Sequence, residues 1–549
     1  MPVYWLEDRK SQSLVSLIVI LLVTGLQIIP TLGAVHLFDW DEINFAEAAR
    51  EMVLSGDYSI VQIGYQPFWE KPPLFIWLQA ASMKLFGINE FAARFPNFLA
   101  AVFTLNSVYR IGSSLNNSRF AIIWTLLYFG SLLPNFYFHT GIIDPWYNLF
   151  SFLGLYYFWE ARGKVKFYIY SGIFLGLAVL TKGPVVVILL ILAVLIALFF
   201  GKQERIPNFK NLIIFGLSGI ITGGSWFIYL AVSGNFELIG QFIEYQWRLL
   251  TTADAGHGGP WYYHFLVLLL GCFPASIFAL PKLTRIIRRS DFSFWMIILF
   301  WVNLAIFTLV KTKIVHYSSF CYFPITYLAA EFLTQATTKR EKEIKFIYSI
   351  AQITFLVLIL ALLFAPMTVM LLEHATPDFL IFFDESIQSA LTQKLNWSFI
   401  DLIPGITLAG IGEYGLILIF EDHKKTKGTI FLSIAICLTI FLASFLILPK
   451  IEKYTQGKFI DYLTIAASKN IPVKTFYFKS YADLYYAKAT SHQPIGRNQT
   501  PEEFINSNHP IIFAISRPKV AELVRAKYPK LKLDSISGGY AFFHSQKFP

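Results

Sequence analysis

Acidic, basic and imidazole side chains in this sequence gather in short segments beside long apolar runs. The candidates for chemistry are Asp41 with Glu42, Glu70 with Lys71, Asp144, Lys182, His257, and Lys311 with Lys313. An ionisable group close to membrane depth is costly, so each of these is a candidate for function by default. A carboxylate can accept a proton or orient a nucleophile, and a lysine can stabilise negative charge that develops during a reaction.

Proline and glycine fix the backbone around several of these groups. Pro72 and Pro73 follow Glu70 and Lys71, so this charged pair is expected to approach a helix start in an extended conformation. Lys182 lies in a Thr-Lys-Gly-Pro segment, which predicts a tight break between two apolar helices.

The acidic residues near position 40 have two interpretations, one structural and one functional. Acidic side chains favour a helix N-terminus, and this suffices to explain Asp39. Asp41 is kept as a functional candidate because it shares one face of the membrane with the other charged segments.

The composition requires a membrane. Of 549 residues, 55% are hydrophobic and only 15% are charged, whereas a soluble domain carries roughly 25% charged residues. This excludes a water-soluble enzyme and a disordered scaffold. The three cysteines lie far apart in apolar segments, which excludes a disulfide framework. The excess of 10 basic residues is better explained by membrane topology than by a nucleic-acid partner.

Apolar segments predict about thirteen transmembrane helices, since a span needs about 20 mostly apolar residues. They cover residues 13–32, 92–111, 119–134, 143–161, 166–181, 184–200, 210–231, 261–280, 292–310, 315–334, 345–372, 399–420 and 428–448. Every second connection is rich in Lys and Arg, as cytoplasmic loops are. The N-terminus is therefore predicted to be cytoplasmic and the C-terminus extracytoplasmic, in a multi-pass protein of the plasma (inner) membrane.

Two long connections on the predicted outer face, 33–91 and 232–260, contain most of the charged candidates. Both are too polar to span a membrane but are rich in aromatic residues suited to its interface. We expect outer juxtamembrane helices here, and long loops in compact proteins are more often functional than mere tethers.

The composition changes near residue 450. Strands are expected at 473–478, 511–515, 531–536 and 540–544, with helices at 451–469, 481–489 and 518–528 and a capping box at 500–503. The fold class is thus mainly α, with a transmembrane domain over 1–449 and a small extracytoplasmic α/β domain over 450–549.

Taken in order, these segments resemble the C-type polyprenyl-phosphate-dependent glycosyltransferases (GT-C), in particular the protein O-mannosyltransferase and lipid A aminoarabinose transferase branch. The resemblance is carried by residues 41–42, 45–47, 49–52, 55–57, 70–74 with 77, 85–87, 93–94, 257–263, 311–313 and 316–317. Members of this family move a sugar from a polyprenyl phosphate, such as undecaprenyl phosphate, to an acceptor with inversion at the anomeric carbon.

The resemblance also implies roles for particular residues. Asp41 takes the position of the catalytic aspartate, with Glu42 beside it, and Asp144 takes a second acidic position that could hold the acceptor or cations. The cations expected at the donor phosphate are Lys71, Lys182, Lys311, Lys313 and Arg94, with Arg248 as a weaker candidate. His316 is interpreted as a structural, hydrogen-bonding residue.

The resemblance further implies a zinc ion held by Glu70 and His257, although a hydrogen-bonded pair without metal fits the sequence equally well because two ligands do not define a zinc site. No nucleotide cofactor is expected. The expected partners are a polyprenyl-phosphate-linked sugar, membrane lipids, and a lipid A, glycan or protein acceptor, bound by a monomer. The donor sugar and the acceptor stay open.

Two other classes of function predict different patterns of charge. A transporter or flippase of a lipid-linked or anionic substrate predicts charges near the bilayer midplane and usually an internal repeat, and no such repeat is visible. A structural or receptor-like membrane protein predicts no convergent charges at all.

Overall fold

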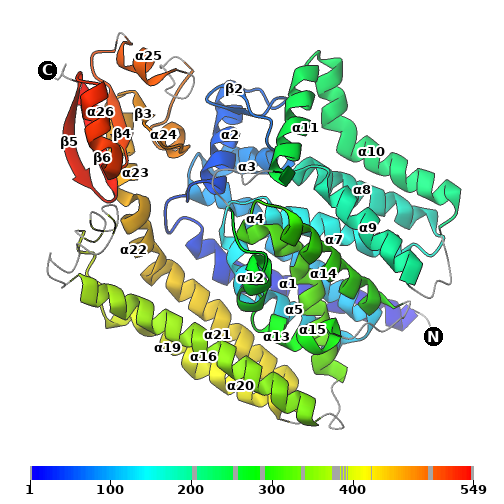
Figure 1. Cartoon of the computed structure of the whole chain (residues 1–549). Coiled ribbons are helices and arrows are strands. Elements are labelled where there is room, and N and C mark those ends of the chain that lie inside the picture. The colour runs from blue at the N-terminus through cyan, green and yellow to red at the C-terminus, as the bar shows by residue number, and fades with distance from the viewer. Residues whose placement is uncertain are drawn as a thin grey trace.

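The computed structural model describes residues 3–200, 207–251, 258–284, 291–335, 341–373, 384, 388, 391, 393–421, 423–491, 499–507 and 509–545. Figure 1 shows a largely helical molecule with a small sheet near the C-terminal end. The prediction of a mainly α fold is confirmed.

The helices follow the apolar segments of the sequence. They are α1 (Val3–Ile28), α2 (Asp41–Ser55), α3 (Leu74–Phe86), α4 (Glu90–Leu115), α5 (Ser118–Phe129), α6 (Leu132–Phe136), α7 (Asp144–Glu160), α8 (Val165–Lys182), α9 (Val185–Phe200), α10 (Phe209–Val232), α11 (Phe236–Thr251), α12 (Tyr263–Gly271), α13 (Ala275–Leu283), α14 (Phe292–Leu309), α15 (Tyr322–Gln335), α16 (Glu341–Leu372), α19 (Ile403–Thr407), α20 (Glu413–Phe420), α21 (Lys425–Leu446), α22 (Leu448–Glu452), α23 (Lys458–Ser468), α24 (Ala482–Tyr485), α25 (Pro501–Ile505) and α26 (Ala521–Lys527). Each of the thirteen predicted spans overlaps one or more of these helices.

By length and apolar character, seven helices in the described residues can cross a membrane, and a bent pair would make an eighth. The pair runs over Ser118–Phe129 and Leu132–His139 with a bend of 74°. Exposed apolar side chains cover much of these helices: only 11% of the apolar window of α10 is buried within the protein, and 17% of that of α16. Such surfaces suit contact with lipid. The chain is a multi-pass membrane protein, and the number thirteen stays a prediction.

The break between α8 and α9 has the form that its sequence predicts. Gly183 ends α8 with a φ of 96°, in the region that favours glycine, and Pro184 lies just before the first residue of α9. Lys182 is thereby held at the C-terminal end of α8, a helix that is about half buried within the protein.

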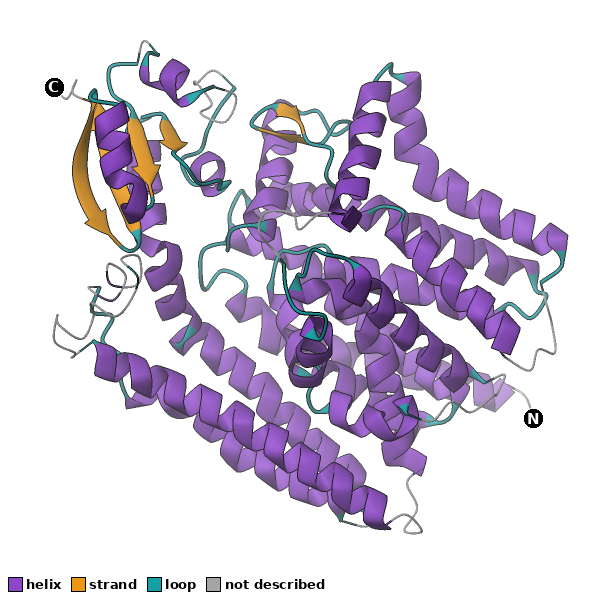
Figure 2. Ribbon diagram, in the orientation of Figure 1, coloured by secondary structure: helices purple, strands orange, loops and turns teal. Residues whose placement is uncertain are grey.

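The C-terminal region contains a four-stranded sheet in the order β3-β4-β6-β5 (Figure 2). Its strands are β3 (Val473–Thr475), β4 (Phe513–Ser516), β5 (Leu531–Ser537) and β6 (Tyr540–Ser545), and β1 (Gln62–Ile63) pairs with β2 (Gln66–Pro67) in a separate hairpin. β3 and β4 are parallel, and the other pairs in the sheet are antiparallel. The four predicted strands and the capping box of Thr500 and Glu503 are confirmed. The domain boundary at 449/450 stays a prediction, since α22 runs across it.

The elements around the first residue of α2 lie at one end of the molecule. In Figure 1, α2, α11, α24 and the sheet all lie toward the top of the view, and α2 contacts α24 directly. The α2 helix buries almost all of its length, from Glu42 to Met52. It is therefore a rigid support for its first residue, Asp41.

Candidate active site

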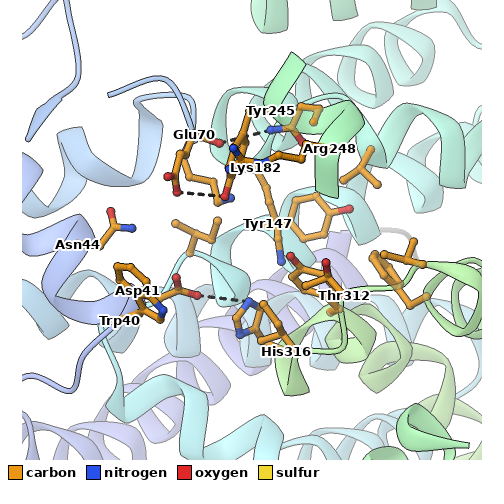
Figure 3. A pocket seen from close by; sticks show the side chains of 18 of the residues that line it. Trp40, Asp41, Asn44, Glu70, Tyr147, Lys182, Tyr245, Arg248, Thr312 and His316 are labelled. Carbon is orange, nitrogen blue, oxygen red and sulfur yellow. Dashed lines mark hydrogen bonds and ion pairs between the residues drawn. The ribbon is translucent and has the colours of Figure 1, made fainter. Parts of the chain in front are cut away.

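A cavity of about 680 Å³ lies where α2, α11 and the segment before α24 meet the helical bundle (Figure 3). Its lining comprises Trp40, Asp41, Asn44, Glu70, Lys71, Ile143, Tyr147, Lys182, Pro184, Val185, Ile188, Tyr245, Gln246, Arg248, Phe307, Val310, Thr312, Ile314, His316, Tyr317, Lys479 and Tyr481. Its charged groups are four cations (Lys71, Lys182, Arg248 and Lys479) and two carboxylates (Asp41 and Glu70). The cavity is thus suited to an anion, with carboxylates beside it.

Asp41 reaches this cavity from the first turn of α2. Its side chain is 37% exposed, and its Oδ2 atom lies 3.5 Å from Nε2 of His316. An accessible carboxylate beside an imidazole can accept a proton from a bound hydroxyl. Figure 3 shows this pair facing each other across the lower part of the cavity.

Asp144 lies behind the cavity wall rather than on it. Its side chain is 1% exposed, and its Oδ1 atom accepts hydrogen bonds from Lys182 Nζ at 2.6 Å and from Ser319 Oγ at 3.2 Å. His316 Nε2 is 4.0 Å from the other carboxylate oxygen. Asp144 is therefore paired directly with Lys182, and His316, which lines the cavity, lies near both Asp41 and Asp144.

Glu70 and Lys71 lie on another part of the wall, next to α11. Tyr245 donates a hydrogen bond to Glu70 Oε2 at 3.1 Å, and Lys71 Nζ lies 5.4 Å from the centre of the Tyr245 ring. Arg248 lies 5.1 Å from the same ring. Burial lowers the pKa of Lys71, while the nearby charges of Glu70 and Asp41 act in the opposite direction.

Glu42 and Arg94, both predicted for the site, are engaged elsewhere. Arg94 donates to both carboxylate oxygens of Glu42, at 2.8 and 2.9 Å, and to the carbonyls of Leu32, Val35 and His36. Burial would raise the pKa of Glu42, but the Arg94 charge and hydrogen bonds lower it overall. Neither residue lines the cavity, and the pair fixes the chain leading into α2. The site roles of Glu42 and Arg94 stay predictions.

Lys313 and Lys311 are also absent from the lining. Lys313 Nζ donates to the carbonyls of Phe307, Thr308 and Val310 at 2.6–2.9 Å, and so satisfies the C-terminal end of α14. Lys311 is exposed outside the cavity. Thr312, which lies between these two lysines in the sequence, lines the cavity instead.

The structure describes only one of the two predicted zinc ligands. His257 lies outside the described residues, and Glu70 is hydrogen bonded to Tyr245. Among the described residues, no group of three or more His, Cys, Asp or Glu side chains could hold a metal ion. Glu70 alone does not make a zinc site, so the zinc ion stays a prediction.

Several lining residues were not predicted. Tyr245 comes from α11, and Lys479 and Tyr481 come from the connection between β3 and α24. Four aromatic residues flank Lys479 in the run Phe476–Tyr481, which was the one local signal. No pattern in the sequence relates this run to Asp41, more than 400 positions away.

Part of the chain is similar in sequence to known proteins. Residues 70–226 match the sequence family described as dolichyl-phosphate-mannose-protein mannosyltransferase. An undecaprenyl phosphate-alpha-4-amino-4-deoxy-L-arabinose arabinosyl transferase from Wigglesworthia glossinidia brevipalpis is 27% identical over 56% of this chain and 57% of its own length. A transferase of the same name from Edwardsiella ictaluri is 28% identical over 58% of this chain and 59% of its own length. The matches therefore span less than two thirds of these relatives.

The fold is shared over the whole chain with a solved structure. The crystal structure of ArnT from Cupriavidus metallidurans bound to undecaprenyl phosphate superimposes with a TM-score of 0.74, covering 97% of each chain at 15% identity. The apo crystal structure of that protein gives a TM-score of 0.75, covering 98% of each chain at 17% identity. The resemblance to the polyprenyl-phosphate-dependent glycosyltransferases, and with it their fold, is confirmed.

Proposed function

We propose that this protein is an inverting glycosyltransferase that moves a sugar from undecaprenyl phosphate to an acceptor at the outer face of the inner membrane. One observation carries the proposal: a single cavity brings an accessible carboxylate, Asp41, together with Lys71, Lys182 and Arg248. The names of the relatives support undecaprenyl phosphate as the carrier and an aminoarabinose as the sugar.

The cations would bind the phosphate of the donor. As the bond between the anomeric carbon and the phosphate oxygen breaks, its electron pair stays with the phosphate, whose negative charge increases. Lys71, Lys182 and Arg248 stabilise this charge. Asp144 fixes the position of the Lys182 ammonium at the cavity wall through the 2.6 Å ion pair.

Asp41 would act at the acceptor. An acceptor oxygen attacks the anomeric carbon from the face opposite the phosphate, which inverts the configuration. A hydroxyl must lose a proton in this step, and Asp41 takes it. A phosphate acceptor is already anionic, so Asp41 would then orient the nucleophile or sugar without accepting a proton.

The test is sugar transfer by the purified full-length protein in nanodiscs. With undecaprenyl phosphate-aminoarabinose as donor and a lipid A glycolipid as acceptor, the wild type should form the glycosylated product, detected by mass spectrometry. Asp41→Asn should lower kcat by at least about a hundredfold, whether Asp41 accepts the proton of the acceptor or orients the nucleophile. Its thermal midpoint should stay close to that of the wild type because Asp41 is accessible rather than buried.

The matched control is Asp57→Asn. Asp57 lies just past the far end of α2 and does not line the cavity, so this variant should retain wild-type transfer. Wild-type turnover by Asp41→Asn would contradict the assignment. Movement of labelled lipid across vesicles without sugar transfer would favour a flippase.

A further inference from the structure

His316 places one imidazole nitrogen between two carboxylates of the site. Its Nε2 atom lies 3.5 Å from Oδ2 of Asp41 and 4.0 Å from Oδ2 of Asp144. The side chain of Asp41 is 37% exposed and lines the cavity, whereas that of Asp144 is 1% exposed. Among the side chains that the structure describes, His316 is the one basic group within 4.0 Å of the Asp41 carboxylate. The imidazole therefore connects the accessible carboxylate to the buried one.

The backbone around His316 is anchored on both sides. His316 belongs to a short 3₁₀ helix, Val315–Cys321, between α14 and α15. Three residues before it, Lys313 donates to three carbonyls at the end of α14. Three residues after it, Ser319 Oγ donates to Asp144 Oδ1 at 3.2 Å. The His316 side chain is itself only 14% exposed, so the ring is presented to Asp41 from a fixed part of the bundle.

The neighbours of Nε2 determine where the proton of the ring lies. An ionised carboxylate only accepts hydrogen bonds, so a nitrogen that faces two carboxylate oxygens is most stable when it carries the proton. Oδ1 of Asp144 already accepts from Lys182 and Ser319, while its Oδ2 has no hydrogen-bond partner among the described residues. Asp144 thus favours the Nε2–H form of His316 from behind, and the nearer oxygen, Asp41 Oδ2, is the one that this N–H addresses.

This contact has a consequence for the free oxygen of Asp41. A separation of 3.5 Å is longer than a formed hydrogen bond, but contacts in catalytic sites commonly tighten when substrate binds. Once Nε2–H holds Oδ2, the carboxylate can no longer rotate, and Oδ1 keeps one direction. Precise direction matters, since a misplacement of about 1 Å can cost about a hundredfold in rate. Figure 3 shows the imidazole and the carboxylate facing each other on the same side of the cavity.

We propose that His316 is the positioning residue for Asp41: its Nε2–H holds Oδ2 and thereby directs Oδ1 toward the attacking oxygen of the acceptor. The proposal rests on the function proposed above and assigns a further residue to that reaction. With a hydroxyl acceptor, the proton moves from the acceptor oxygen to Asp41 Oδ1 and from there to water. No proton passes to His316, whose N–H bond stays intact throughout.

The first experiment measures sugar transfer with variants that differ in the N–H group. His316→Phe keeps a ring of similar size but has no N–H, so it should lower kcat about ten- to a hundredfold while leaving the donor KM and the affinity for undecaprenyl phosphate unchanged. His316→Gln can place an amide N–H near the position of Nε2 and should recover most of kcat. Wild-type kcat in His316→Phe, or a His316→Gln variant no better than His316→Phe at an unchanged thermal midpoint, would overturn the proposal.

A double-mutant cycle tests whether His316 acts through Asp41. In the Asp41→Asn background there is no carboxylate to position, so His316→Phe should cause no further loss of kcat. Fully additive losses would show that His316 serves another part of the site, such as the donor phosphate, and would overturn the proposal.

The matched control is His264→Asn in α12. His264 is fully buried close to the same 3₁₀ helix, where its Nδ1 lies 3.2 Å from Ser318 Oγ, but it does not line the cavity. The asparagine amide can take the place of Nδ1, so this variant should retain wild-type kcat. A loss as large as that of His316→Phe would show that any change of a histidine near this helix disturbs the site, and would overturn the specific role of His316.

The last experiment needs no substrate and so separates the two proposals. Imidazole ¹⁵N resonances are recorded for the full-length, histidine-labelled protein in nanodiscs, with His316→Gln identifying the resonance of His316. Asp41→Ala should move that resonance and Asp57→Asn should not, and a resonance that Asp41→Ala leaves in place would overturn the proposal. A resonance that moves in a wild-type protein that transfers no sugar would support the contact between His316 and Asp41 while overturning the proposed function.

Discussion

Asp144 carries a carboxylate almost fully out of water, and the cavity depends on how that carboxylate is paired. Its partners are Lys182, which is 11% exposed, and Ser319. Removing one partner of a buried ion pair usually costs about 3–5 kcal/mol because the other charge is left without compensation. The same pair sets the direction of a cation that we assign to the donor phosphate, so stability and donor binding are linked here.

We therefore expect Asp144→Asn to lower both the thermal midpoint and the affinity for undecaprenyl phosphate. The double variant with Lys182→Met should recover part of the stability, since no buried charge is left unpaired, but none of the affinity. Thermal unfolding in detergent and equilibrium binding to nanodiscs measure the two effects separately.

A second buried pair provides the control. Asp401 is 2% exposed and accepts a hydrogen bond from Lys450 at 2.6 Å, and neither residue lines the cavity. Asp401→Asn should destabilise the protein while leaving undecaprenyl phosphate binding unchanged. If Asp144→Asn behaves in the same way, Asp144 is structural only.

Residue types alone identified the acids and bases of the site but not their partners. Asp41, Glu70, Lys71 and Lys182 were predicted from the sequence and share one cavity. Glu42 has the same local sequence setting as Asp41, yet its side chain faces in a different direction, toward Arg94 in α4. Neighbouring positions on a helix point about 100° apart, so only the packing of α2 decides which carboxylate reaches the cavity.

At the scale of elements, the position of Lys182 depends on how closely α8 packs against α10. Glycines make this approach possible. A Cβ atom added at Gly176 would lie 2.6 Å from Thr222 Cβ and 2.7 Å from the backbone nitrogen of Gly223. Backbone atoms cannot move aside cheaply, so any side chain at this position must push the helices apart.

Gly176→Ala is expected to destabilise the protein by about 1–3 kcal/mol, the usual cost of overpacking. Since α8 ends at Lys182, the displacement should also weaken binding of undecaprenyl phosphate. Thermal unfolding and binding in nanodiscs check these two effects.

Gly216→Ala is the matched control in α10, because a Cβ there would meet nothing within 4 Å. Alanine has the higher helix propensity, so this variant should be neutral or slightly more stable. Equal destabilisation by both substitutions would show that helix packing at Gly176 is not the cause.

Local sequence patterns predicted the helices and strands well because each of these elements is formed by residues that are close together in the chain. Apolar runs gave the helices, the Gly-Pro pair gave the break after Lys182, and the strands expected at 473–478, 511–515, 531–536 and 540–544 correspond to β3 to β6. The bend of 74° between α5 and the following helix was missed, since residues 119–134 read as one apolar run. The role of Lys313 was missed for a similar reason: its three carbonyl partners at the end of α14 depend on the turn that the chain makes there.

At the scale of the whole molecule, the C-terminal region holds the start of the outer segment. Tyr486 accepts a hydrogen bond from the backbone N–H of Leu37 at 2.7 Å, and Gln456 donates to the Leu37 carbonyl at 2.8 Å. Arg50, in α2, donates to the carbonyl of Ala489 at 2.8 Å. The chain on both sides of Asp41 is thus tied to residues more than 400 positions later, and no sequence pattern could predict these contacts.

A further contact between these two parts of the chain contains a titratable group, His36. His36 Nδ1 lies 3.1 Å from Glu452 Oε1, and this hydrogen bond raises the pKa of His36 although partial burial acts in the opposite direction. The charges of Glu90 and Asp461 also raise it. A histidine with a raised pKa binds its proton more tightly in the folded state, so the stabilisation is complete below the unfolded pKa of about 6.5. It is lost as the pH rises through the higher, folded value.

The thermal midpoint of the wild type should therefore contain a contribution from His36 that is larger at about pH 6 than at about pH 8. His36→Gln cannot be protonated, so its midpoint should lie below that of the wild type at about pH 6 and close to it at about pH 8. Comparing the two proteins at each pH cancels the titration of all other groups. A constant difference between them at both pH values would show that the ion pair with Glu452 does not connect the outer segment to α22. A difference confined to the lower pH would show that protonated His36 joins the chain before Asp41 to Glu452 in α22, and so helps to hold Asp41 in place.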